Sequence, residues 1–64
     1  MPTDFTLQDH GSIFLLVPNT ADAQDWAADH LPTDAQFFGK GVAIEPRYVE
    51  PIVNGIVADG LTIA

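Results

Sequence analysis

The stretch Ser12-Ile13-Phe14-Leu15-Leu16-Val17, closed by Pro18, decides the fold that this sequence predicts. A continuous apolar run of this length is typical of a strand that has neighbours on both sides. Proline ends the run because its nitrogen carries no hydrogen for a strand ladder. We therefore expect a central strand over residues 12–17. The run is far shorter than a membrane span, so it belongs to a globular core.

The residues before this strand predict a hairpin. Residues 4–8 alternate between polar and apolar side chains, as a half-buried strand does. Asp9-His10-Gly11 is a turn signal between the two runs. Two strands joined by a short loop that contains glycine favour an antiparallel pair.

A helix is expected after Pro18. Asn19 and Thr20 can cap its start, and Pro32 stops it near Leu31. Its apolar stripe consists of Ala23, Trp26, Ala27 and Leu31, with His30 at the margin. We interpret Trp26 as the anchor of this helix on the sheet.

A second helix is expected where Val49, Ile52, Val53, Ile56 and Val57 recur at helical spacing. Pro51 belongs in a first helical turn, so the regular helix should start near Tyr48 to Glu50 and not earlier. Gly60 should follow the helix as its C′ residue.

Three shorter elements complete the second half of the chain. Thr33-Asp34 could cap a short turn through residues 35–38, where Phe37 and Phe38 would fill the core. Residues 42–45 predict a strand that Pro46 ends, and residues 61–63 predict a short last strand.

This order, ββαβαβ, predicts a single α+β domain over residues 1–64. We expect a small three- to four-stranded, mainly antiparallel sheet with two helices packed on one face. The hydrophobic content of 47% is too high for a disordered acidic tail. The chain has no cysteine, so it has no disulfide and no thiolate metal site, which favours a reducing cytoplasm.

The charge of the chain restricts its partners. Nine acids against two bases give a net charge of −7, which repels nucleic acid and anionic membranes. The start Met1-Pro2-Thr3-Asp4 lacks the basic residues of a signal peptide, so we expect a soluble cytoplasmic protein. A protein with a basic groove is the favoured partner. The alternative is that the acids only keep a small protein soluble, as a monomer or weak homodimer.

The sequence gives little support to a catalytic site or a metal site. His10 and His30 have no third ligand at metal spacing, and Ser12 beside His10 is not a nucleophile–base arrangement. Gly39-Lys40-Gly41 lacks the rest of a phosphate loop and leads into a strand instead of a helix. We therefore expect no enzymatic activity, no metal and no cofactor.

Three carboxylates of the first expected helix lie in a row. Asp22, Asp25 and Asp29 share one helix face, separated along the axis by about 4.5 and 6 Å. No Lys or Arg follows at the spacing that would offset their repulsion, so the row predicts a surface that imitates nucleic acid. The full set of candidate partner-binding residues is Asp22, Asp25, Asp29, Asp34, Glu45, Glu50 and Tyr48.

Several stretches resemble a family of short proteins from proteobacteria and their mobile elements. They are residues 10–18, Asp25-Trp26, residues 29–32, residues 45–48, residues 52–55 and residues 59–62. The family includes an anti-CRISPR inhibitor of the type I-C system. The resemblance implies an inhibitor that acts in the cytoplasm of a bacterial host. It implies a CRISPR surveillance complex as partner, blocked by an acidic, DNA-mimicking surface.

An interaction module of another kind is the rival hypothesis. An antitoxin-like or accessory partner would make mainly apolar contacts through Tyr48 and through exposed members of Phe37 and Phe38. Tyr48 stands beside Arg47 at a helix entry, and tyrosine and arginine are enriched in interface hot spots. Salt-insensitive binding would distinguish this module from an acidic inhibitor.

Overall fold

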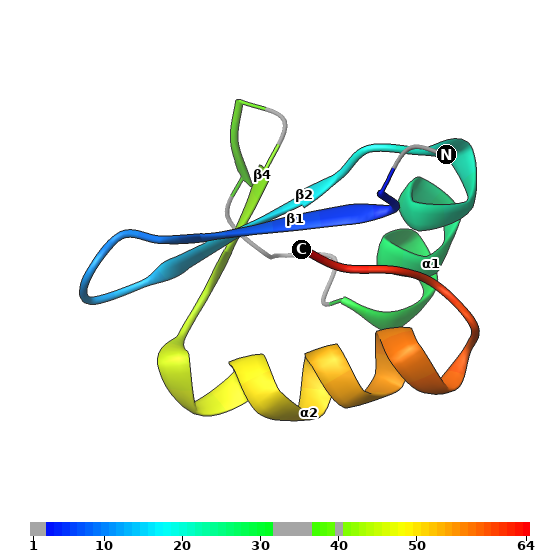
Figure 1. The fold of residues 1–64 in the computed structure, drawn as a ribbon. Helices are drawn as coiled ribbons and strands as arrows, with labels where there is room; N and C mark the ends of the chain where they lie inside the picture. Colours follow the sequence, from blue (N-terminus) through cyan, green and yellow to red (C-terminus); the bar gives the residue numbers. More distant parts are fainter. Residues whose placement is uncertain (1–2, 32–36, 40) are drawn as a thin grey trace.

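Four strands and two helices form the described part of the chain (Figure 1). The computed structural model describes residues 3–31, 37–39 and 41–64. The elements are β1 (Phe5–Asp9), β2 (Phe14–Pro18), α1 (Ala21–His30), β3 (Phe37–Phe38), β4 (Gly41–Ile44) and α2 (Pro46–Ala58). The sheet order is β1-β2-β4-β3, and every neighbouring pair of strands is antiparallel. The predicted α+β fold is confirmed.

Strand β2 occupies the interior of the sheet, as its apolar run predicts. It pairs with β1 from Phe5↔Pro18 to Asp9↔Phe14, and with β4 from Phe14↔Ile44 to Leu16↔Val42. The predicted hairpin is confirmed. Gly11 has a φ of 84°, and its amide donates to the Asp9 carboxylate over 2.9 Å, which closes the turn.

The end of the described chain returns to its beginning. Residues 62–64 run parallel to β1, and Phe5 pairs with Ile63 in a bridge. The Phe5 amide donates to the Thr62 carbonyl over 2.9 Å, and the Ala64 amide donates to the Phe5 carbonyl over 3.0 Å. The expected last strand is therefore a short parallel addition that covers the outer edge of β1.

Both helices contribute to one core on the same face of the sheet. Alternate residues of the strands, which the pairing places on one face, meet side chains from α1 and α2. The buried side chains are Phe5, Leu16, Ala23, Trp26, Val42, Ile44 and Ile56. Trp26 is only 8% exposed and meets Phe5 edge to face, with ring centroids 5.7 Å apart. The expectation that Trp26 anchors α1 on the sheet is confirmed.

Helix α2 begins earlier than expected. It starts at Pro46 and continues through Pro51, so the expected start near Tyr48 to Glu50 is wrong. Pro46 suits the first helical position, because its fixed φ and missing N–H cost nothing there. Pro51 removes an interior helical hydrogen bond at a cost of about 3 kcal/mol. Ile56 is fully buried, which contributes about 1.5–3 kcal/mol, and the partly buried Val49 and Ile52 also pack against the core, so that burial offsets the cost.

The C-terminal end of α2 agrees with the prediction. Gly60 follows the Asp59 cap with a φ of 82°, a backbone conformation that favours glycine. Its amide donates to the Val57 carbonyl over 3.0 Å, and the Leu61 amide donates to the Ile56 carbonyl over 3.1 Å. These two bonds close the helix in a Schellman motif.

The segment before β4 contains a strand where a helical turn was expected. Phe37 and Phe38 pair with Val42 and Gly41, so the expected turn through residues 35–38 is wrong at these two positions. Gly39, with a φ of 60°, allows the reversal that brings β3 back against β4. The expected cap at Thr33-Asp34 lies outside the described residues.

Candidate functional site

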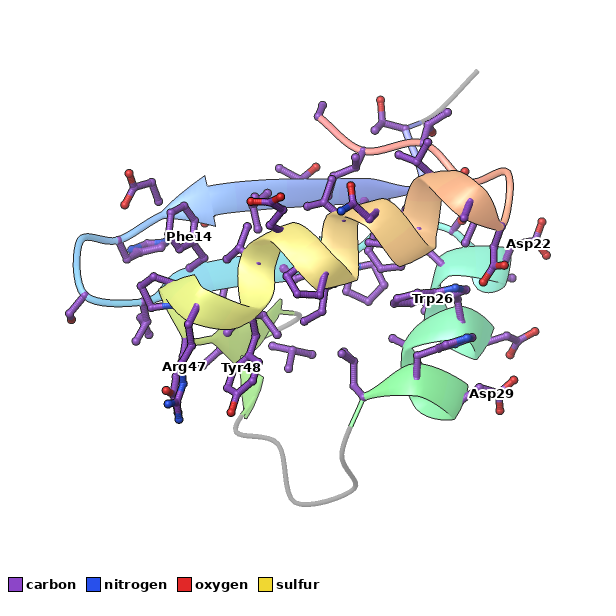
Figure 2. The ribbon with its side chains drawn as sticks, turned by 90° about the horizontal axis from the view of Figure 1, so that it is seen from below. Phe14, Asp22, Trp26, Asp29, Arg47 and Tyr48 are labelled. Carbon is purple, nitrogen blue, oxygen red and sulfur yellow. The ribbon has the colours of Figure 1, made fainter. Side chains whose placement is uncertain are left out.

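The acidic row lies on the outer side of α1. Asp22, Asp25 and Asp29 are all exposed. Figure 2 shows Asp22 and Asp29 on the side of α1 that faces away from α2, whereas Trp26 lies between the two helices. Among the residues that the structure describes, none of the three carboxylates has an ion-pair partner.

The orientation of the row follows from how α1 is capped and packed. Thr20 caps the helix, and its hydroxyl oxygen accepts from the Ala23 amide over 3.1 Å. Ala23 and Trp26 are buried against the sheet. Residues on the opposite side of the helix must therefore face solvent, and the acids at i, i+3 and i+7 are among them.

Trp26 and His30 form a stacked pair beside the carboxylate of Asp59, the residue that caps α2. Their rings lie 4.2 Å apart and nearly parallel, at 10°. The Trp26 indole Nε1 donates to Asp59 Oδ2 over 2.6 Å, and His30 Nε2 lies 3.7 Å from the same oxygen. His30 Nδ1 lies 2.9 Å from the Trp26 carbonyl oxygen, so the ring is held from both sides. The cluster places a fourth carboxylate beside the acidic helix.

This cluster was missed by the sequence analysis. The sequence pattern predicts His30 only at the margin of the apolar stripe and predicts no role for Asp59. His30 ends α1 and Asp59 caps α2, and nothing local in the sequence indicates that they meet. The signal that could have found them is chemical, because a buried indole N–H needs an acceptor.

Asp4 joins three parts of the chain through hydrogen bonds near the N-terminal end of α1. One carboxylate oxygen accepts from the Thr20 hydroxyl over 2.7 Å. The other accepts from the Thr62 amide over 3.0 Å and from the Thr62 hydroxyl over 3.2 Å. These bonds stabilise the carboxylate, so they hold the pKa of Asp4 below its usual range, with the Thr20 hydroxyl as the largest cause.

We expect Asp4 to make the stability of the fold sensitive to acid. Because its pKa is lower in the folded chain than in the unfolded chain, its contribution is present above the unfolded pKa, about 3.9. The contribution disappears as the pH falls through the lower, folded pKa. Asp4→Asn should therefore have a lower Tm than the wild type at pH 7, and the difference should shrink toward zero in strong acid. Thermal unfolding of both proteins followed by circular dichroism measures it, and a constant difference across this pH range would contradict the assignment.

The remaining candidate residues do not join the row on α1. Glu45 and Glu50 are exposed near the start of α2, and Tyr48 is 49% exposed beside them. The far end of α2 contacts Trp26 through Asp59, and a 13-residue helix is about 20 Å long. Figure 2 shows Tyr48 at the end of α2 that lies away from the labelled aspartates of α1. Asp34 lies outside the described residues.

The positively charged side chain of Arg47 lies over the ring of Tyr48. The Arg47 guanidinium carbon lies 4.9 Å from the centroid of the Tyr48 ring, and Arg47 Nε lies 3.1 Å from the Glu45 carboxylate. Arg47 is therefore paired with the acid two residues before it, Glu45. Lys40 lies outside the described residues.

The charges are therefore distributed unevenly over the described part of the molecule. Five of the nine acids lie on α1 or contact its residues, namely Asp4, Asp22, Asp25, Asp29 and Asp59. Arg47 lies at the distant end of α2, where it is already paired with an acid. The surface around α1 thus combines a high density of negative charge with no described lysine or arginine.

Among the residues that the structure describes, no group of three His, Asp or Glu side chains could hold a metal ion. His10 contacts Gln8 at the hairpin, with 3.1 Å between its Nε2 and the Gln8 amide oxygen. In the described ranges, no helix has the length and apolar character that crossing a membrane requires.

Comparison with protein family models, curated proteins and solved structures finds no match for this chain.

Proposed function

We propose that this protein is a non-enzymatic inhibitor that binds the basic nucleic-acid groove of another protein through α1. The observation that carries the proposal is the exposed row of Asp22, Asp25 and Asp29, without an ion-pair partner among the described residues. Three neighbouring carboxylates cost a helix repulsion, and core packing does not need them there. A partner that offers Lys and Arg side chains relieves this repulsion when it binds.

The surroundings of α1 reinforce the row. Asp59 is held beside α1 by the Trp26 indole, and Asp4 is held at the start of α1 by Thr20. Fixed carboxylates need little further ordering when they meet a cation, so less side-chain entropy is lost on binding. Charge-assisted hydrogen bonds to arginine or lysine then add to the long-range attraction between the −7 protein and a basic groove.

A type I-C CRISPR surveillance complex is the proposed partner, on the basis of the family resemblance. RNA-guided complexes of this kind hold nucleic acid in a positively charged channel and contact its backbone there. An acidic helix in that channel occupies the positions of backbone phosphates and prevents DNA from entering. The protein itself needs no catalytic residue and no cofactor to act in this way.

Competition at two salt concentrations tests the proposal. The purified complex is mixed with labelled target duplex, and the protein is added at increasing concentration in about 0.1 M and about 0.5 M salt. We expect DNA to be displaced at low salt. Direct binding of the protein to the immobilised complex, measured without DNA, should weaken at least tenfold at the higher salt, where the Debye length falls to about 4 Å. Binding to the complex that does not change with salt would contradict the acidic mechanism.

A second function is favoured by one observation at the other end of α2. Tyr48 is a half-exposed aromatic residue whose ring is covered on one side by Arg47. Such a pair suits an accessory or antitoxin-like interaction module, whose binding depends on aromatic contact area. Tyr48→Ala should abolish binding by that module, whereas salt should have little effect.

A further inference from the structure

Two hydrogen-bond acceptors face each other in the cluster of Trp26, His30 and Asp59. His30 Nδ1 lies 2.9 Å from the Trp26 carbonyl oxygen, which can only accept, so Nδ1 carries the proton of the neutral ring. The lone pair of the ring is then on Nε2, which lies 3.7 Å from Asp59 Oδ2. Among the residues that the structure describes, no group donates to this lone pair or to the second oxygen of Asp59. The cluster therefore has unused acceptors on two neighbouring side chains.

The cluster is accessible, yet its side chains are held in place. The side chains of His30 and Asp59 are 48% and 50% exposed. Trp26 stacks on one face of the imidazole, so the exposed part of that ring is its opposite face and its edge. Helix α2 in turn packs closely on the indole, because a Cβ added at Gly55 would lie 3.3 Å from Trp26 Cζ2. A ligand thus meets an imidazole face and a carboxylate whose positions are already set.

The electrostatic field at the cluster favours a cation. Asp59 caps the C-terminal end of α2, where the helix dipole is negative and no basic residue lies in the last turn. Asp25 and Asp29 are exposed on the neighbouring helix. A cation bound to Asp59 is therefore attracted by the end of α2 and by the acidic row as well.

We propose that the cluster of Trp26, His30 and Asp59 binds one arginine side chain of the partner protein. The inference rests on the proposed function and assigns one specific contact to it. The planar guanidinium stacks on the open face of His30, and its N–H groups donate to Asp59. The Trp26 indole has the same relation to both groups, since it stacks on the imidazole and donates to the carboxylate. Lysine fits less well, because its ammonium group has no planar face.

Titration with ethylguanidinium tests the site without any partner protein. The chain has one tryptophan, so its indole N–H gives a single NMR resonance, and this group donates to Asp59. At about pH 8, where histidine is ordinarily neutral, ethylguanidinium should shift this resonance and those of the His30 ring along a saturable curve. Ethylammonium at the same ionic strength should cause only a small part of the shift.

Two variants that lose the same charge show whether the shift depends on the site. Asp59→Asn should remove the saturable shift. Asp9→Asn, on the exposed hairpin, should keep it.

Binding to the immobilised surveillance complex tests whether a partner arginine uses the site. Asp59→Asn should weaken binding about tenfold or more, because it loses one charge-assisted contact. Asp9→Asn should bind within a factor of about two of the wild type, because an exposed charge away from the contact contributes little.

The outcomes separate this inference from the proposed function. An indole resonance that does not move, equal shifts with both cations, or a saturable shift that survives Asp59→Asn overturns the arginine site. If Asp59→Asn binds the complex as well as the wild type does, the arginine site is also wrong, while the proposed function stands. A wild type that does not bind the complex contradicts the proposed function, and the ethylguanidinium titration then decides the arginine site by itself.

Discussion

Replacing Asp22, Asp25 and Asp29 together by asparagine should abolish inhibition while the fold remains intact. The change removes three negative charges and keeps the shape of each side chain. All three residues are exposed and take no part in the core, so unfolding should change little. The expected result is at least a hundredfold loss of affinity for the surveillance complex. This corresponds to two or more charge-assisted contacts of about 1.5–3 kcal/mol each. Competition with labelled target DNA measures it.

A variant with the same net charge separates a specific surface from general acidity. Asp9→Asn combined with Ser12→Lys and Asn54→Lys also raises the net charge from −7 by three units, to −4. These three residues are exposed and lie outside α1. This control should inhibit within a few-fold of the wild type. If the α1 variant inhibits as well as the wild type, or both variants lose inhibition equally, the acidic-helix mechanism is wrong.

Trp26→Ala should destabilise the fold more than any other single substitution proposed for this chain. Removing a buried tryptophan costs about 3–5 kcal/mol. A chain of 64 residues has a total stability of about 3–10 kcal/mol, so the loss removes between about a third and all of it. Trp26 also joins α1 to two other parts of the fold, through its ring contact with Phe5 on β1 and its hydrogen bond to Asp59 after α2. Urea unfolding followed by circular dichroism at 222 nm, the α-helical signal, measures the loss.

Trp26→Phe separates the contribution of ring packing from that of the hydrogen bond to Asp59. Phenylalanine retains a ring that can pack against Phe5 and His30, but it cannot donate to Asp59. We expect a loss of about 1–2 kcal/mol, because Asp59 is half exposed and water partly replaces the lost bond. Asp59→Asn keeps an oxygen that can accept from the indole and should cost less than Trp26→Phe. An alanine variant as stable as the phenylalanine variant would show that the ring itself contributes little.

The sequence predicts most of the fold because the hydrophobic periodicity and the chain breakers agree. The apolar run at residues 13–17 predicts the interior strand, and Thr20 and Gly60 mark helix ends that the structure shows. The predicted start of α2 was wrong because it assumed that Pro51 must lie in the first helical turn. Tertiary packing instead holds Pro51 in the interior of the helix. Burial of Val49, Ile52 and Ile56 outweighs the missing hydrogen bond at Pro51.

The surroundings of the candidate site were harder to predict than the row itself. Helical spacing alone places Asp22, Asp25 and Asp29 on one face, and their exposure agrees with it. The contact between Trp26 and Asp59 joins residues 33 positions apart, and the contact between Asp4 and Thr62 joins residues 58 positions apart. Such contacts follow from how the elements pack, and no local pattern encodes them. The same reason explains why Glu45 and Glu50, acidic like the row, lie at another end of the molecule.

The pairing of residues 62–64 with β1 has a consequence for the order of folding. During synthesis β1 emerges from the ribosome before β2, which follows closely enough to pair with it. The other edge of β1 cannot form its hydrogen bonds until residues 62–64 have been made. The bond between Asp4 and Thr62 forms only then as well. Closing a loop of nearly the whole chain delays this final step. The nascent protein therefore carries an unprotected strand edge until that step, and a chaperone that covers extended segments should bind it in that interval.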